Sequence, residues 1–120
     1  MTRKRLPEVR PSLTHKVEIQ GADLYIIAGY FPDTGDIGEI FINIGKQGST
    51  LRGFVDSWAI LMSIAMQTEG SDLDAIITKF KGQTFEPNGM TTNTEIPECT
   101  SLLDYMVRWI EGHRKVELKI

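Results

Sequence analysis

The sequence predicts an α+β domain in which a three-stranded antiparallel sheet is followed by three helices, in two layers. Three observations lead to this prediction. Between residues 15 and 44, three short segments have the apolar alternation or the β-branched and aromatic content of strands. After residue 50, apolar residues recur at helical spacing. The connections between the strand segments are short, which favours antiparallel neighbours, and strands that precede helices are typical of the α+β class.

The three strands are expected at residues 15–20, 24–31 and 38–44. Val17 and Ile19 alternate with polar residues in the first strand, whereas the second strand is apolar on both faces. Turn-forming residues separate the strands, and a glycine- and serine-containing segment ends the sheet before the first helix.

The outer face of this sheet is expected to lack a cover. Three helices packed on one face leave Tyr25, Ile27 and Phe41 exposed on the other. Uncovered apolar residues usually mark an interface. We therefore expect a homo-oligomer, a dimer or a trimer of dimers.

The helices are expected at about 50–68, from Leu73 to a stop at Gly82, and at about 101–112. Ser49 or Thr50 is expected to cap the first helix. Seven apolar residues at helical spacing are expected to face inward from it: Leu51, Phe54, Val55, Trp58, Leu61, Met62 and Ala65. The alternating tail 116–120 is expected to add a short edge strand.

Length and charge limit the domain organisation. The 120 residues form one domain, an extended basic arm at 1–14 followed by a single α+β unit at 15–120. The net charge of −3 argues against a nucleic-acid polymer as partner. Residues 1–16 nevertheless carry five basic residues against one acidic residue. This arm either meets an anion or an acidic subunit, or is solvated and partly disordered.

The cellular location is expected to be cytoplasmic, or the host cytoplasm if a phage encodes the chain. Cys99 is the single cysteine, which excludes an intrachain disulfide and a cysteine-based metal cluster. No apolar run approaches the roughly 20 residues of a membrane span, and no signal peptide is recognised.

No catalytic constellation is visible. His15 and His113 lie at opposite ends of the chain, and neither is near Cys99 in sequence. Cys99 precedes a helix start, which could lower its pKa, although a buried neutral cysteine is the alternative. No metalloprotease, hydrolase or repeated acidic metal motif occurs. We expect no enzyme activity, no cofactor and no metal.

The polar loop 85–93 is the main candidate site, because binding groups concentrate in loops held by a rigid scaffold. Phe85 would stack a base or, alternatively, anchor the loop in the core. Thr91, Thr92 and Asn93 would bond ribose hydroxyls. The alternative for the whole segment is a plain interhelical connection.

Two arginines would neutralise phosphates in this site. Arg108 lies on the third helix, and Arg52 lies on the first turn of the first helix. The alternative for Arg108 is an ion pair with Asp104, four residues earlier.

A second candidate is a phosphate loop at Gly48, Ser49 and Thr50. Glycines and hydroxyls before a helix can expose backbone N–H groups to an anion. The alternative is an ordinary strand-to-helix turn.

Several short motifs, in order along nearly the whole chain, resemble the C-terminal TSCPD-type domain of adenosylcobalamin-dependent ribonucleotide reductases. The motifs run from the basic start through the centre to the third helix: Arg3-Lys4-Arg5-Leu6-Pro7, Arg10-Pro11-Ser12, Thr14-His15-Lys16, Gly38-Glu39-Ile40-Phe41-Ile42, Gly48-Ser49-Thr50-Leu51, Asp56-Ser57, Phe85-Glu86-Pro87, Glu95-Ile96-Pro97, Asp104-Tyr105 and Arg108-Trp109. The catalytic barrel and the paired tail cysteines of a reductase are missing from the chain. The resemblance therefore implies an accessory subunit, docked through the basic arm and the open sheet face, and marks Phe85-Glu86-Pro87 as possible scaffold.

Size and element order also resemble phage anti-Thoeris proteins, which sequester cyclic ADP-ribose-type signals. This second resemblance uses Phe85, Asn93 and Arg108. With the candidate loop it leads to our main expectation, a non-enzymatic protein that sequesters a phosphate-bearing adenine nucleotide, of the cyclic ADP-ribose type or a cyclic oligonucleotide. The alternative is the accessory domain of a ribonucleotide reductase.

Overall fold

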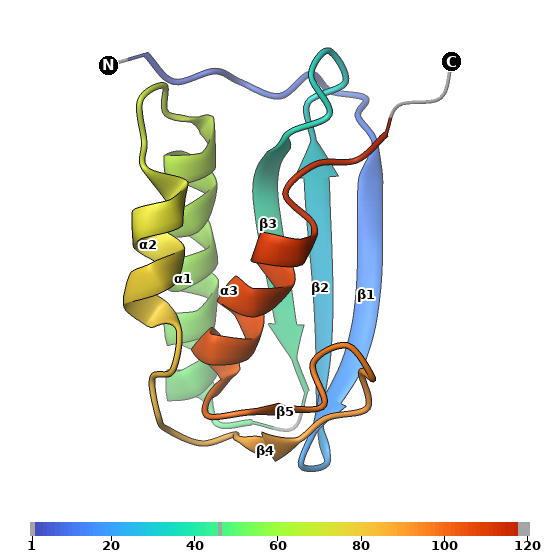
Figure 1. The fold of residues 1–120 in the computed structure, drawn as a ribbon, viewed down its shortest axis with the longest axis vertical. Helices are drawn as coiled ribbons and strands as arrows, with labels where there is room; N and C mark the ends of the chain where they lie inside the picture. The colour runs from blue at the N-terminus through green and yellow to red at the C-terminus, as the bar shows by residue number, and fades with distance from the viewer. Residues whose placement is uncertain (1, 46, 118–120) are drawn as a thin grey trace.

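One antiparallel sheet forms the centre of the molecule, in the strand order β1–β2–β3. The computed structural model describes residues 2–45 and 47–117. The elements in chain order are β1 (Ser12–Ile19), β2 (Ala22–Tyr30), β3 (Ile37–Ile44), α1 (Ser49–Gln67), α2 (Leu73–Phe80), β4 (Gly89–Met90), β5 (Glu98–Cys99) and α3 (Leu102–Gly112) (Figure 1). A three-stranded antiparallel sheet followed by three helices confirms the predicted α+β class.

The β1–β2 turn is a two-residue hairpin formed by Gln20 and Gly21, since Ile19 pairs with Ala22. Both turn residues have positive φ, 48° and 82°. A hairpin whose two central residues both have positive φ has the twist that matches antiparallel strands. Gln20 also donates its backbone N–H to Met90 O at 3.0 Å, which fixes the hairpin against β4.

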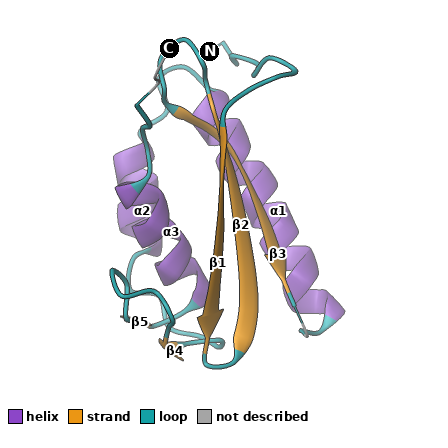
Figure 2. Ribbon diagram, turned by 90° about the vertical axis from the view of Figure 1, so that its right-hand side faces the viewer, coloured by secondary structure: helices purple, strands orange, loops and turns teal. Residues whose placement is uncertain are grey.

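The inner face of the sheet and the helices α2 and α3 enclose the core, to which α1 adds Val55, Ala59 and Met62. The strand register places Val17, Leu24 and Ile44 side by side, and all three are buried. Figure 2 shows α2 and α3 together on this side of the sheet. Tyr105 and Trp109 of α3 are buried among these residues. Each such large side chain contributes roughly 1.5–3 kcal/mol on leaving water.

Helix α1 lies along the free edge of β3 instead of over the middle of the sheet (Figures 1 and 2). Ser63 Oγ accepts the N–H of Ile40 at 2.9 Å, and Gln67 Nε2 donates to Gly38 O at 2.9 Å. These side chains satisfy backbone groups that an edge strand would otherwise leave unpaired.

This placement corrects the inward face predicted for the first helix. Val55 and Met62 are buried as expected, but Phe54 is 72% exposed and Leu61 is 63% exposed. A helix beside a sheet edge buries a narrower stripe than a helix that lies across a sheet face, so part of the apolar pattern faces outward.

The basic arm is extended and bonded to the domain at several points, although most of its residues are exposed. Arg3 Nε donates to Gln67 Oε1 at 2.7 Å, and Lys4 N donates to Gln67 O at 2.7 Å. Arg10 forms a two-point ion pair with Glu39 of β3. Pro11 O accepts the N–H of Tyr30, so β1 begins at Ser12, earlier than expected.

The chain near its other end bonds to the β2–β3 turn. Val116 N donates to Gly35 O at 2.9 Å, and Lys115 bridges to Asp36. Residues 118–120 of the predicted tail strand lie outside the described residues. The β4–β5 pair was not expected, because two residues per strand are too few to show a period.

Candidate functional site

The predicted threonine ligands of the polar loop hold the loop to itself and to β1. Thr91 N donates to Pro97 O at 2.9 Å, and its hydroxyl bonds to Ile96 O. Thr92 exchanges two bonds with Glu18: its N–H donates to Glu18 O at 3.1 Å, and its Oγ1 accepts Glu18 N–H at 2.9 Å. Both hydroxyls are therefore engaged in internal contacts.

Asn93 is engaged in the same way. Its Oδ1 accepts the N–H of Glu95 at 3.0 Å, and its Nδ2 donates to the hydroxyl of Tyr105 at 3.0 Å. Tyr105 is fully buried on α3. The amide thus joins the loop to the core. Ligand contact by Thr91, Thr92 and Asn93 stays an untested prediction.

Arg108 pairs with Asp104, as predicted by the alternative to a phosphate-binding role. Its Nη1 lies 3.3 Å from Asp104 Oδ2 and donates to Glu98 O at 2.8 Å. The guanidinium is directed along α3 toward β5, and no hydrogen bond joins it to Phe85 or Arg52 among the described residues.

Asp104 is the residue on which this region depends, and sequence reasoning missed its role. It is 4% exposed, and its carboxylate accepts the N–H groups of Gly82 at 2.8 Å and Thr100 at 3.1 Å. Burial opposes ionisation, but these N–H groups and Arg108 lower the pKa of Asp104 below its ordinary value. The capping spacing with Ser101, whose Oγ accepts Asp104 N–H at 3.0 Å, was the signal available in the sequence.

Phe85 and Arg52 lie in different surroundings. Phe85 is half-buried and packs against the core, and its N–H donates to Thr100 O at 3.1 Å. That environment favours the anchor role over base stacking. Arg52 is exposed on the first turn of α1.

The predicted phosphate loop is an uncapped helix start. Gly48 is the N-cap of α1 and provides no side-chain hydrogen bond, so the expected cap by Ser49 or Thr50 is wrong. Gly48, Ser49 and Thr50 are all exposed. An anion role for these three residues stays a prediction.

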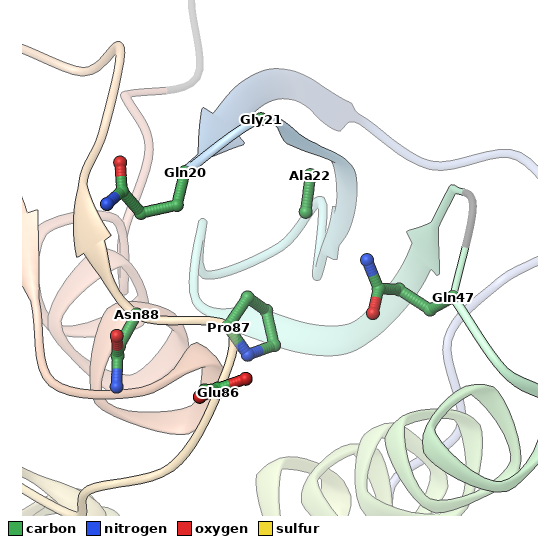
Figure 3. Close-up of a pocket in the computed structure, with 7 residues that line it drawn as sticks. All are labelled: Gln20, Gly21, Ala22, Gln47, Glu86, Pro87 and Asn88. Atoms are coloured by element: carbon green, nitrogen blue, oxygen red, sulfur yellow. The ribbon is translucent and has the colours of Figure 1, made fainter.

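An open pocket of about 680 Å³ lies at the end of the sheet that carries the β1–β2 turn (Figure 3). Seven residues line it: Gln20, Gly21, Ala22, Gln47, Glu86, Pro87 and Asn88. These described lining residues provide three amides and one carboxylate but no basic side chain. A polyphosphate ligand requires cations or a set of converging N–H donors, so this lining does not favour one.

A polar and aromatic cluster of two half-buried histidines, His15 and His113, and two buried rings, Tyr105 and Trp109, joins β1 to α3. His15 Nε2 lies 2.8 Å from the hydroxyl of Tyr105, which also accepts from Asn93. The rings of His15 and His113 both stack on Trp109, with centroids 5.6 Å and 4.2 Å away. Burial, and then the charge of His113, lower the pKa of His15, while Glu95 acts in the opposite direction.

Outside this cluster, the described residues provide few candidates for reactive groups, metal sites or membrane helices. Cys99 is 6% exposed, and burial raises the pKa of its thiol, which supports the neutral alternative over a reactive one. Within residues 2–45 and 47–117, no cluster of three or more His, Cys, Asp or Glu side chains could hold a metal ion. Among the described helices, none is long and apolar enough to cross a membrane.

The outer face of the sheet is open, as predicted. Tyr25 is 41% exposed, Ile27 40% and Phe41 54%, and Ile27 pairs with Phe41 across β2 and β3. A groove of about 570 Å³ continues from Phe41 to Ile60 and Ile64 of α1. These five residues are called the outer apolar surface below.

One end of the outer apolar surface is closed by charge. The Arg10–Glu39 pair lies over Gly29, where an added Cβ atom would overlap the carboxylate of Glu39. Arg10 of the basic arm therefore pairs with a carboxylate of its own domain. Lys4 is used similarly, in an ion pair with Asp33 at 2.7 Å.

Comparison with known proteins gives one consistent result. The TSCPD domain family matches residues 1–114. A vitamin B12-dependent ribonucleotide reductase of Rhodopirellula baltica is 46% identical over 108 residues, which are 90% of this chain and 10% of that protein. The protein of the same name from Streptomyces coelicolor is 41% identical over 106 residues, 88% of this chain and 11% of its own length. The one from Agrobacterium fabrum is 38% identical over 107 residues, 88% of this chain and 8% of its own length.

These findings correct the main expectation. The relatives carry the name of a ribonucleotide reductase, and the chain spans about a tenth of their length. The expectation of a cyclic nucleotide sponge is therefore wrong, and the reductase alternative is favoured. No solved structure matches the chain significantly. The family match and the relatives, which agree with the motifs found in the sequence, show that the chain belongs to the TSCPD domain family.

Proposed function

We propose that the chain is a non-catalytic accessory domain of a vitamin B12-dependent ribonucleotide reductase, and that it docks on the catalytic part of that enzyme through the outer apolar surface. The observation that carries the proposal is the exposure of Phe41, Ile60 and their neighbours on one concave, apolar side of the domain. Contiguous exposed apolar residues are typical of protein interaction sites.

The polar parts of the domain support a docking role over a chemical one. The loop hydroxyls and Asn93 are bonded internally, and the half-buried His15 is bonded to the buried hydroxyl of Tyr105. Arg10 and Lys4 of the basic arm form ion pairs within the domain. Docking through the basic arm therefore receives less support than docking through the sheet face.

Binding to a shortened reductase tests the proposal. The Rhodopirellula baltica relative, from which the matching tenth has been removed, is mixed with the purified chain and examined by size-exclusion chromatography with light scattering. We expect a stoichiometric complex. The double variant Phe41→Thr/Ile60→Gln should weaken it at least about tenfold, because central apolar residues carry most of an interface's binding energy.

Met90→Thr is the matched control. Met90 is 62% exposed but belongs to β4, away from the outer apolar surface, so its replacement should leave the complex intact. Absence of a complex with the unchanged chain, or equal weakening by Met90→Thr and by the double variant, would contradict the proposal.

A further inference from the structure

The two edges of the central sheet are covered to different extents. Side chains of α1 bond to the β3 edge at Ile40, through Ser63, and at Gly38, through Gln67. Among the described residues, the β1 edge has hydrogen-bond partners only near its end, where Glu18 bonds to Thr92 and Gln20 bonds to Met90. Figure 1 shows β1 at the outer side of the sheet, with the loop after β4 beside its lower end and the segment after α3 crossing the view near its upper end.

The hydrogen-bond pattern shows which β1 residues point outward. Pro11 O accepts from Tyr30 of β2, so odd-numbered residues direct their backbone groups into the sheet. Even-numbered residues direct theirs away, as the outward bonds of Glu18 confirm. The outward N–H and C=O groups of Ser12, Thr14 and Lys16 have no hydrogen-bond partner among the described residues, and all three residues are exposed.

This segment, unpaired among the described residues, has defined ends. Beyond Lys16, the contact between Glu18 and Thr92 occupies the edge. At the other end, β1 begins at Ser12, and the preceding segment is held by the ion pair of Arg10 with Glu39. Within the part of the chain that the structure describes, residues 12–16 therefore form a short ladder of unpaired outward backbone groups, symmetric about Thr14.

We propose that this segment pairs antiparallel with the same segment of a second copy, with Thr14 opposite Thr14. This register gives every outward residue an outward partner, since Ser12 of each copy faces Lys16 of the other. Centring the pair on Lys16 would oppose two like charges and collide with Thr92.

The proposed pair also covers an apolar residue that the monomer leaves at the surface. Leu13 is 36% exposed, and in this register it lies opposite His15 of the second copy. The twofold axis is perpendicular to the sheet, so the sheet continues across both copies, and both outer apolar surfaces face the same side. The inference is independent of the proposed reductase partner.

The pairing is short compared with the roughly 800 Å² that each partner buries in a standard interface, so association is expected to be weak. Light scattering and sedimentation of the full chain from about 10 µM to about 1 mM should show a concentration-dependent dimer. Hydrogen exchange at Ser12, Thr14 and Lys16 should slow as the dimer forms.

Thr14→Pro is the decisive variant. Proline removes an N–H that points away from β2, so the internal ladder stays intact while the outer pairing is blocked. We expect a monomer with an unchanged circular dichroism spectrum, whereas Thr14→Val should still dimerise. A chain that stays monomeric at every concentration, or a Thr14→Pro variant that dimerises like the unchanged chain, would overturn the proposal.

A cross-linking variant keeps the test valid if Thr14→Pro does not fold. In the proposed pair, the two residues at position 14 have Cα atoms about 5.5 Å apart, within disulfide reach. Thr14→Cys should therefore form a disulfide-linked dimer under mild oxidation, and Ser57→Cys, exposed on α1, should not. Equal cross-linking of the two variants, or none with Thr14→Cys, would also overturn it.

Discussion

Two regions differ from what their compositions suggest. One is the polar loop between Gly82 and Ser101, and the other is the outer apolar surface. The loop is rich in hydroxyl and amide groups, yet Thr91, Thr92 and Asn93 all bond to the domain itself. The outer apolar surface is rich in residues typical of a core, yet these residues face solvent.

This contrast follows from the different needs of polar and apolar groups. An irregular loop contains backbone N–H and C=O groups that no helix or sheet satisfies, and leaving them unpaired inside a protein costs about 1–3 kcal/mol each. Polar side chains within the loop supply those bonds. Exposed apolar side chains form no comparable bonds, and their contiguity on one side indicates a partner. Polarity of a loop is therefore weak evidence for a ligand site.

Loss of the Asp104 carboxylate should have the largest effect and tests whether the loop is held internally. Asp104→Ala leaves the N–H groups of Gly82 and Thr100 without their acceptor, so we expect a loss of about 3 kcal/mol in unfolding free energy. Urea unfolding measures it. Asp56→Ala, at an exposed position on α1, should change stability by less than about 0.5 kcal/mol. Similar small effects in both variants would show that the loop does not depend on Asp104.

Removal of the Tyr105 hydroxyl should have a smaller effect. Tyr105→Phe breaks the contacts with Asn93 and His15, and we expect a loss of about 1.5 kcal/mol. Tyr25→Phe is the matched control, because the ring of Tyr25 lies on the open sheet face. If the two substitutions have equal effects on the urea midpoint, the amide of Asn93 does not fasten the loop to α3.

Acidification should weaken the same contacts. His15 lies against Tyr105 and Trp109 and near His113 and Glu95, and its pKa is lowered in the folded protein, first by burial. The unfolded chain then binds the proton more readily, so stability should fall as the pH decreases below about 6.5. Urea midpoints between about pH 7.5 and pH 5.5 measure this.

The control for the pH experiment is His15→Gln, which keeps a hydrogen-bonding side chain but does not titrate. This variant should lose stability less steeply over the same range. A slope equal to that of the unchanged chain would assign the pH dependence to other groups.

The outer apolar surface should give the smallest change in stability. Phe41→Thr/Ile60→Gln should alter the unfolding free energy by less than about 0.5 kcal/mol, because both side chains are mostly solvated. Ile42→Thr, one position along β3 but facing the core, should cost about 2 kcal/mol or more. A large loss in the double variant would mean that the surface contributes to the fold and is not free for a partner.

Periodicity predicted the elements well where they are long. All three strands of the main sheet and all three helices lie where their patterns indicated, with shifts of a few residues at the ends. The exposure of Tyr25, Ile27 and Phe41 also followed from counting helices against sheet faces. The β4–β5 pair could not be predicted this way, because its pairing depends on contacts between segments and not on a repeating pattern.

The candidate site was less predictable, because the type of a side chain does not show which hydrogen-bond or ion-pair partner it has in the fold. Arg108 and Asp104 are four residues apart on a helix, so their pairing was foreseeable. The acceptance of Gly82 N–H by the same carboxylate joins segments 22 residues apart, and nothing local in the sequence indicates it.

The sequence by itself determined the fold class, the family and the open face of the sheet, since alternation, helical spacing and collinear motifs are local properties of the chain. The tertiary structure decided three further features. It placed α1 at the β3 edge and so moved Phe54 and Leu61 outward. It also bonded the polar loop to the domain and left the β1 edge between Ser12 and Lys16 without hydrogen-bond partners in residues 2–45 and 47–117. Each of these features depends on hydrogen bonds between groups that are far apart in the sequence, and such bonds form only when the whole domain is folded.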